Sequence, residues 1–401
     1  MTRPPAAART ALVALAATLA IQIYTSVTAT APAVLAPVLA PDLGITPTWI
    51  GVFVGLLYAG AMLGSLTSGE FVARYGAIRV SQACVLICGA GLAAMALVPQ
   101  AAAALLVIAA VFMGIGYGPI TVASSELLAR TTPPDRMALT FSIKQTGVPV
   151  GAALAGALLP AAALAMGWRS AFLLVAAAGL LVVVSAQPTR NALDLRNPER
   201  KPFSLAAILA PLQLILRTPR LLELSVAGFA FAAVQVCLSS FLVVYLTESL
   251  EWSLVASGLA LTCATMGAVP GRIIWGALAD RSRSATRVLA SISVLAALCG
   301  AGLALAGPGW PGWLLLPLAA LYGFSAIGWN GVQLSELARR APPGAAASVT
   351  GASGFITFGG VMAGPMLFAA LAGATGGYRF GFALCALVSG VTATVLLIRE
   401  R

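Results

Sequence analysis

Long apolar runs dominate this sequence and restrict the environment in which the chain can fold. Hydrophobic residues make up 60% of its 401 residues and charged residues only 9%, more apolar surface than a water-soluble fold can bury. Each run is near or above the ~20 residues that a helix needs to cross a bilayer. The sequence therefore predicts an all-α membrane protein with twelve transmembrane helices, at 11–39, 49–69, 79–98, 101–124, 138–165, 170–187, 221–246, 254–279, 286–306, 311–334, 344–374 and 378–398.

The distribution of positive charge predicts the orientation of these helices. The net charge is +11, but only Arg169 and Arg379 lie at the face opposite the N-terminus, and only Lys144 and Arg272 lie more than two residues inside an apolar run. The other basic residues lie in connections on the N-terminal side, and such an excess marks the cytoplasmic face. We therefore expect a multi-pass protein of a bacterial-type inner membrane with both termini in the cytoplasm. The basic residues are topology signals, so the lipid bilayer is an expected partner and nucleic acid is not.

Cysteine and histidine usage gives no sign of a cofactor or of catalysis. The six cysteines all lie inside apolar runs without metal-like clustering, and the chain has no histidine, the commonest metal ligand and general base. No span carries a deep acid–base pair. We therefore expect neither a metal, nor a cofactor, nor an enzyme.

The chain contains an internal repeat. The segment at 125–133 matches the segment at 335–343, and 167–172 matches 377–382; both pairs share one offset, 335 − 125 = 377 − 167 = 210. Six helices therefore repeat as six helices in parallel orientation. The predicted organisation is an N-terminal half at 1–187, a central cytoplasmic connection at 188–220 and a C-terminal half at 221–401.

Two loops carry a motif that connects this repeat to a known family. Residues 69–79 read GEFVARYGAIR and residues 276–283 read GALADRSR. They resemble the Gly-x-x-x-Asp-Arg-x-Gly-x-Arg loop of the major facilitator superfamily, although Ala73 replaces the acid in the first copy. The resemblance implies two pseudo-symmetric six-helix halves, the major facilitator fold, with a substrate site between the halves and an alternating-access mechanism. We expect such a carrier to be a monomer.

Lys144 and Arg272 are the strongest candidates for substrate binding, because an ion deep in a span demands a functional reason. Lys144 lies 144 − 136 = 8 residues beyond Arg136, and Arg272 lies 280 − 272 = 8 residues before Asp280. At 1.5 Å per residue both ions are roughly 12 Å inside the cytoplasmic boundary. One ion comes from each half, an arrangement suited to an anion.

Structural roles for these two residues stay open from sequence alone. Lys144 could extend to the cytoplasmic face or pair with Glu126, and Arg272 could pair with Asp280 at the helix end. Further polar residues occupy spans that line the cavity in the resembled family, and they complete the predicted substrate site: Gln22, Tyr24, Tyr117, Gln145, Gln235, Asn330 and Gln333. A second set, at cytoplasmic helix ends, is predicted to brace or gate the structure: Arg74, Glu126, Arg130, Asp280, Arg281, Glu336 and Arg340.

The absence of acidic residues from the interior of the predicted spans indicates the charge of the substrate. All twelve Asp and Glu residues fall at or outside helix ends, so a cationic substrate would have no deep partner. The segment at 271–276 also resembles the arginine-bearing helix of oxalate/formate exchangers and monocarboxylate carriers. We therefore predict a secondary transporter of a small organic anion, a mono- or dicarboxylate, working as a proton symporter or an anion exchanger. The alternative is an exporter of drugs or apolar metabolites, because residues 147–151, GVPVG, resemble a glycine–proline signature of efflux proteins.

Overall fold

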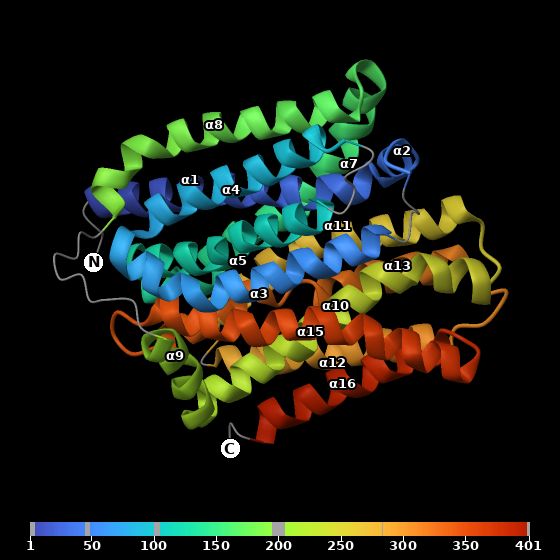
Figure 1. Ribbon diagram of the computed structural model, residues 1–401. Helices are drawn as coiled ribbons and strands as arrows, with labels where there is room; N and C mark the ends of the chain where they lie inside the picture. The colour runs from blue at the N-terminus through green and yellow to red at the C-terminus, as the bar shows by residue number, and fades with distance from the viewer. Residues whose placement is uncertain (1–4, 45–48, 100–104, 195–204, 283, 399–401) are drawn as a thin grey trace. The chain divides into compact units, whose positions relative to one another are not determined.

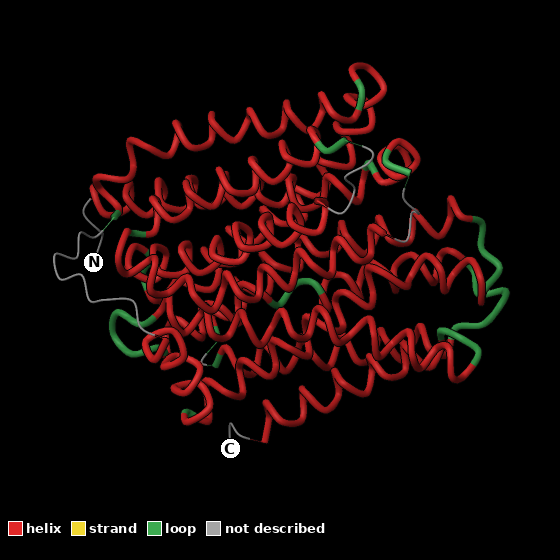
Figure 2. The backbone as a smooth tube through the Cα atoms, viewed as in Figure 1, coloured by secondary structure: helices red, strands yellow, loops and turns green. Residues whose placement is uncertain are grey.

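The protein is helical throughout the part of the chain that the structure describes. This structure, a computed structural model, covers residues 5–44, 49–99, 105–194, 205–282 and 284–398, and these ranges contain helices and short connections but no strand (Figures 1 and 2). Eleven helical segments within them are long and apolar enough to cross a membrane. Helix α11, at Leu254–Arg281, is not among the eleven, but its 28 residues are enough to span a bilayer. The predicted all-α membrane fold is confirmed.

The helices follow one another with few intervening residues. Their bounds are α1 (Pro5–Val34), α2 (Ala36–Asp42), α3 (Trp49–Tyr75), α4 (Ala77–Leu97), α5 (Leu105–Thr131), the 3-10 helix η2 (Pro134–Arg136), α6 (Met137–Gln145), α7 (Gly147–Met166), α8 (Trp168–Leu193), α9 (Leu205–Arg217), α10 (Pro219–Ser249), α11 (Leu254–Arg281), α12 (Ala285–Leu305), α13 (Gly312–Ala326), α14 (Asn330–Arg340), α15 (Ala346–Thr375) and α16 (Arg379–Ile398).

Three predicted spans are each divided into two helices. The run at 11–39 forms α1 and α2, the run at 138–165 forms α6 and α7, and the run at 311–334 forms α13 and the first part of α14. Lys144 lies beside the second of these breaks, and Asn330 beside the third. Each of these runs is predicted from sequence to be one continuous helix, and the structure differs by placing a break beside two candidate site residues.

The described chain forms two compact units. Unit 1 consists of Met1–Thr132, Lys144–Thr218 and Ala338–Phe355, and unit 2 of Pro133–Ile143, Pro219–Leu337 and Ile356–Arg401. Three helices, α6, α14 and α15, are therefore divided between the two units. The predicted boundaries at 187 and 221 stay a prediction; within the predicted connection, α8 continues to Leu193, residues 195–204 lie outside the described ranges, and α9 follows.

Close helix contacts through glycine hold unit 1 together. α3 packs on α5, α4 on both α5 and α8, and α1 on α7. A Cβ added at Gly114 would clash with the backbone of Leu57, and one added at Gly60 would clash with the carbonyl of Val111. Small residues allow membrane helices to approach this closely, and the gain comes from packing contacts. The apolar core beside them includes Phe53, Leu92 and Phe172.

Close helix contacts through glycine hold unit 2 together as well. α12 packs on α16, and α11 packs on α13. A Cβ at Gly323 of α13 would clash with the carbonyl of Ala264 on α11, and a Cβ at Gly267 would clash with that of Ala320. The aromatic residue Phe368 stacks on Phe241 with ring centroids 4.2 Å apart, inside the core of this unit. The close approach of α11 and α13 decides the surroundings of Arg272.

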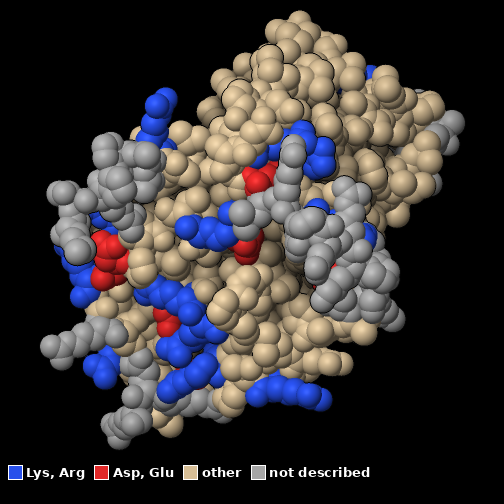
Figure 3. Space-filling model, turned by 90° about the vertical axis from the view of Figure 1, so that its left-hand side faces the viewer, with Lys and Arg blue, Asp and Glu red and all other residues tan. Residues whose placement is uncertain are grey.

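Many large apolar side chains are exposed on the outer faces of the spans, among them Leu181 at 73% and Leu298 at 65%. Exposure of this kind is expected where a helix faces lipid. Charged side chains gather elsewhere, and Lys and Arg are prominent on the face shown in Figure 3.

Candidate substrate site

Lys144 is a buried cation at the end of α6. Its side chain is 1% exposed, and Nζ donates one hydrogen bond to Oε1 of Gln22 on α1 at 2.6 Å and a second to Oε1 of Gln145 at 3.3 Å. Hydrogen bonds from a charged donor are stronger than those between neutral groups. The low exposure argues against the alternative in which the ammonium extends to the surface.

A helix break places Lys144 here. Pro149 has no amide hydrogen, so it cannot bond to the carbonyl of Gln145 four residues earlier, and helices bend or stop under that condition. The chain accordingly leaves α6 at Gln145 and enters α7 at Gly147, with Thr146 between them. The lysine is therefore the second-last residue of a short helix.

One face of α1 packs against the break between α6 and α7. Gln22 and Ser26 are four residues apart and so lie on one side of the helix. Ser26 Oγ donates to the carbonyl of Val148 at 2.7 Å, while Gly147 lies against Gln22 and Gly151 against Ser26 so closely that a Cβ at either glycine would meet these side chains. The face of α1 thus fixes both the lysine and the start of α7.

Arg272 is the second buried cation, in α11 of unit 2, and is also 1% exposed. Its Nε donates to the carbonyl of Ile327 at 3.2 Å, and its Nη2 donates to Oδ1 of Asn330 at 3.1 Å. One turn along the same helix face, Trp275 Nε1 donates to the carbonyl of Phe324 at 3.0 Å. Two side chains of α11 therefore donate hydrogen bonds to one short stretch of backbone.

That stretch is the interrupted end of α13. The last carbonyls of a helix have no intrahelical partner, and they carry the negative end of the helix dipole, which attracts cations. α13 ends at Ala326 and α14 begins at Asn330, so Arg272 and Trp275 satisfy carbonyls that the break releases. A Cβ at Gly271 would clash with the backbone of Phe324. Glycine at this position therefore lets α11 approach α13 closely enough for Arg272 and Trp275 to reach these carbonyls.

The other predicted substrate residues of unit 2 hold α10 and α14 together. Trp329 Nε1 donates to Oε1 of Gln235 at 3.1 Å, and the Trp329 ring stacks on Phe231. Gln333 is 2% exposed and donates from Nε2 to the carbonyl of Leu224 at 3.0 Å. Of these residues, Asn330 is the one in direct contact with Arg272.

Tyr24 and Tyr117 lie apart from the lysine cluster. Tyr24 is two residues from Gln22, which places it on the opposite side of α1 at 3.6 residues per turn, and a Cβ at Gly89 or Gly179 would strike its hydroxyl. Tyr117 on α5 packs edge-on against Tyr58, with ring centroids 6.5 Å apart. The structure therefore brings together Lys144, Gln22 and Gln145 in unit 1, and Arg272 and Asn330 in unit 2.

The acids predicted to brace the structure bind helix ends. Asp280 accepts hydrogen bonds from the amides of Ala138 at 2.9 Å and Leu139 at 2.7 Å, in the first turn of α6. A carboxylate is favourable at a helix N-terminus because it accepts the free amides and meets the positive dipole end. Asp280 lies eight residues from Arg272, about 12 Å along α11. Its amide partners on α6 differ from the suggested pairing with Arg272.

Glu126 has the corresponding role in unit 1. It pairs with Arg130, Nε to Oε1 at 3.4 Å, and its Oε2 accepts from the amide of Ala347, in the first turn of α15, at 3.3 Å. These partners differ from the suggested pairing with Lys144. Glu336, its counterpart in the repeat, is 7% exposed, Arg74 is half-buried, and Arg281 and Arg340 are exposed.

Sequence reasoning missed Ser26, Trp275 and Trp329. Each donates a hydrogen bond to a backbone or amide oxygen near a candidate residue. Spacing offered a signal for two of them, because Ser26 follows Gln22 by four residues and Trp275 follows Arg272 by three, and such pairs share a helix face.

Comparison with known proteins agrees with the all-helical membrane fold. The sequence profile of the Major Facilitator Superfamily matches residues 16–365. The chain therefore belongs to the Major Facilitator Superfamily. This family is one of secondary transporters and not of enzymes, as predicted, and the chain is a multi-pass membrane protein.

Two curated relatives match part of the chain. A protein of Bacillus subtilis (strain 168) named "Hexuronate transporter" is 26% identical over 151 residues, 38% of this chain and 35% of that protein. A protein of Arabidopsis thaliana named "Probable anion transporter 3, chloroplastic" is 32% identical over 171 residues, 41% of this chain and 31% of that protein. The chain thus spans about a third of the length of these relatives.

Solved structures match over nearly the whole chain. The fucose:proton symporter of E. coli superposes with a TM-score of 0.77 at 14% identity, and the human organic anion transporter TETRAN with a TM-score of 0.75 at 18% identity. Each match covers 98% of this chain and 100% of the other. At these identities the likeness establishes the shared fold.

Proposed function

We propose that the protein transports a small organic anion, a mono- or dicarboxylate, and that Lys144 and Arg272 bind its acidic groups. The observation that carries the proposal is that two basic side chains, each 1% exposed, lie within helices that cross the membrane. Charges at such depth are costly and mark functional sites by default.

The chemistry of the two cations suits a carboxylate. The planar guanidinium of Arg272 can present two parallel N–H groups to one carboxylate, while the ammonium of Lys144 supplies a compact charge. Amide oxygens of Gln22, Gln145 and Asn330 orient these donors. A neutral oxygen orients a cation without cancelling its charge, so the site keeps its attraction for an anion.

The names of relatives support the same class of substrate. One curated relative is named as a hexuronate transporter and another as an anion transporter, and a structural neighbour is an organic anion transporter. The other polar residues predicted for the site, Tyr24 and Tyr117 in unit 1 and Gln235 and Gln333 in unit 2, take supporting roles in the proposal: they pack or bond the helices that carry the binding residues.

The proposed carrier works by alternating access as a proton symporter or an anion exchanger. It acts as a monomer in a bacterial-type inner membrane. Both termini lie in the cytoplasm, in accordance with the distribution of basic residues. Glu126 and Asp280 accept backbone amides in the first turns of α15 and α6, and in the proposal the release of these contacts, with Glu336 in the equivalent role, accompanies the change of state.

A ligand screen tests this proposal. Purified protein is heated with a series of small carboxylates, their neutral amides and a panel of apolar drugs. A ligand that binds only the folded state raises the unfolding temperature, and we expect carboxylates to do so and amides not to. Stabilisation by drugs without any response to carboxylates would favour the exporter instead.

A further inference from the structure

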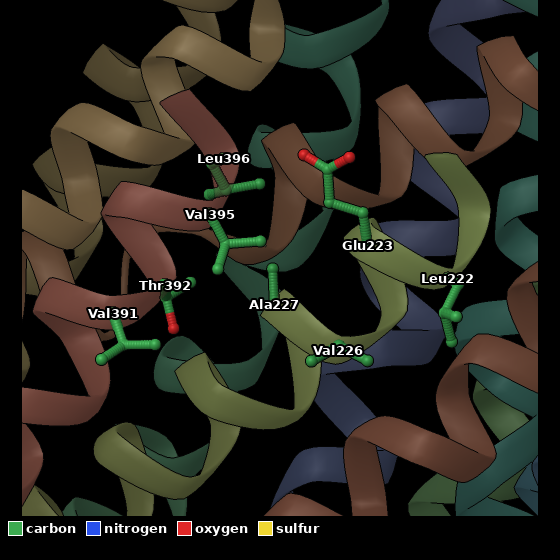
Figure 4. A pocket seen from close by; sticks show the side chains of 8 residues that line it. All are labelled: Leu222, Glu223, Val226, Ala227, Val391, Thr392, Val395 and Leu396. Carbon is green, nitrogen blue, oxygen red and sulfur yellow. The ribbon is translucent and has the colours of Figure 1, made fainter. Parts of the chain in front are cut away.

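A pocket with a polar corner lies at one end of unit 2, apart from Lys144 and Arg272. Its volume is about 220 Å³, and it lies between the first turns of α10 and the last turns of α16 (Figure 4). Apolar side chains make up most of the lining, including Val226 and Ala227 from α10 and Val391 and Val395 from α16.

The apolar part of the lining is open to the surroundings of the helices. Val226 is 52% exposed, Val391 54% and Val395 41%, and all three lie in helices that cross the membrane. Exposed aliphatic side chains at such positions face lipid chains. The pocket is therefore a groove that opens toward the bilayer.

Glu223 makes one corner of this groove chemically unusual. Its side chain is 2% exposed, and although Oε2 pairs with Arg220 Nη1 at 3.2 Å, Oε1 has no hydrogen-bond partner in the part of the chain that the structure describes. Thr392, the other polar residue of the lining, donates to the carbonyl of Val388 in its own helix. A buried carboxylate oxygen without a donor is unfavourable, so Glu223 points to a donor supplied from outside.

The depth of Glu223 indicates where that donor comes from. It lies 223 − 219 = 4 residues from the start of α10, about 6 Å along the helix axis, at the level where headgroups meet acyl chains. Arg220, at the first turn of the same helix and 42% exposed in its side chain, adds a positive charge next to the acid. The groove thus offers a carboxylate and an apolar wall, and the guanidinium of Arg220 pairs with that carboxylate beside the groove.

We propose that this groove binds a phospholipid whose headgroup carries a primary amine, a phosphatidylethanolamine. Its ammonium donates to Glu223 Oε1, its phosphate meets Arg220, and an acyl chain covers Val226, Val391 and Val395. A choline headgroup has no N–H and cannot donate to the carboxylate, and a glycerol headgroup lacks the positive charge.

Thermal unfolding of the purified full-length protein tests this assignment. The protein in mixed micelles receives phosphatidylethanolamine, phosphatidylcholine or phosphatidylglycerol with identical acyl chains, or soluble phosphoethanolamine. We expect phosphatidylethanolamine to raise the unfolding temperature by about 3 °C or more over the other additions. Glu223→Gln should remove this preference, and Glu248→Gln, an exposed acid near the opposite end of α10, should keep it.

The remaining outcomes also decide the question. Equal stabilisation by the choline lipid, or an unchanged preference in Glu223→Gln, would refute the lipid site. Stabilisation by soluble phosphoethanolamine to the same extent would show that the groove takes a free headgroup and not a lipid. If Glu223→Gln does not fold, Val226→Phe fills the groove from an exposed position, and persistence of the preference in that variant would equally overturn the proposal.

Discussion

Arg272 donates a hydrogen bond from Nε to the carbonyl of Ile327, 3.2 Å away, directly after the last residue of α13. The bond joins a permanent positive charge to backbone that the helix break leaves without an intrahelical partner. Asn330, the first residue of α14, accepts from Nη2 of the same guanidinium. The two short helices that replace one predicted span therefore meet at the arginine, and a change in either would move it.

Arg272→Lys should abolish most transport although it keeps the charge. A lysine cannot present two parallel N–H groups of a rigid planar fork to a carboxylate. We expect anion uptake into proteoliposomes to fall by at least about tenfold, equivalent to ~1.4 kcal/mol. Arg217→Lys, at an exposed arginine that ends α9 and belongs to neither predicted set, is the matched control. Normal uptake by Arg272→Lys would remove the anchor role.

Lys144→Gln should weaken anion binding by about tenfold or more, since it replaces a buried ammonium by a neutral amide. Gln22→Leu removes the acceptor at 2.6 Å and should lower affinity as well, because Lys144 loses the partner that orients it. Binding is measured by competition with a labelled carboxylate. An unchanged affinity in Lys144→Gln would exclude the lysine from the site.

Lys144 is also our candidate for the coupled proton, because it is the titratable basic residue at this depth. In that case a pH gradient should stimulate uptake by the wild type but not by Lys144→Gln. The measurement is uptake into proteoliposomes with and without the gradient. Equal stimulation of both proteins would assign the proton to another group or to the substrate.

Most of the architecture could be predicted from sequence because a bilayer leaves few choices. Apolar runs must become helices, since lipid offers no partner for free backbone groups, but the burial of Lys144 could not be decided while extension to the cytoplasmic face stayed open. The breaks could be expected only in part. Pro149 gives a physical reason for the interruption at Thr146, whereas 327–329 holds no proline and only the weaker helix breaker Gly328, and there Arg272 and Trp275 stabilise the open backbone from another helix.

The partners inside each site could not be predicted because the helices are apolar on all sides. Gln22 and Tyr24 looked equivalent along α1 although they face opposite directions, toward Lys144 and toward Gly89 respectively. An amphipathic helix would reveal which side is buried. In a membrane span, tertiary packing alone makes that distinction.

Glu126→Ala should reduce stability and turnover more than substrate affinity. The variant leaves the Ala347 amide, now bonded at 3.3 Å, and Arg130 without this acceptor, and loss of a helix cap lowers the free energy of unfolding by about 1 kcal/mol. Glu336→Ala, at the repeat position, should behave in the same way. The unfolding temperature and the dissociation constant are compared in both variants; a selective loss of affinity would contradict a bracing role.

Asp194, which follows α8, should give stability a pH dependence of defined sign. Burial raises the pKa of its carboxyl above the ordinary 3.8, although the amides of Ile78 and Arg79 and the charges of Arg190 and Arg130 lower it. The folded state therefore binds more protons than the unfolded chain between the two pKa values, and the free energy of unfolding falls as pH rises through that window. We expect the unfolding temperature of the wild type minus that of Asp194→Asn to decrease as pH rises from 3.8. An increase would contradict this sign.

Counterflow of a labelled carboxylate tests the central claim most directly. Proteoliposomes are loaded with an unlabelled mono- or dicarboxylate, a hexuronate or the neutral amide of the same acid, and accumulation of the label is followed for the wild type, Lys144→Gln, Arg272→Lys and Arg217→Lys. We predict that wild type and Arg217→Lys accumulate the label against internal carboxylate but not against amide, and that the two site variants do not. Accumulation that is equal for acid and amide, or that survives in both site variants, would contradict an anion carrier built on Lys144 and Arg272.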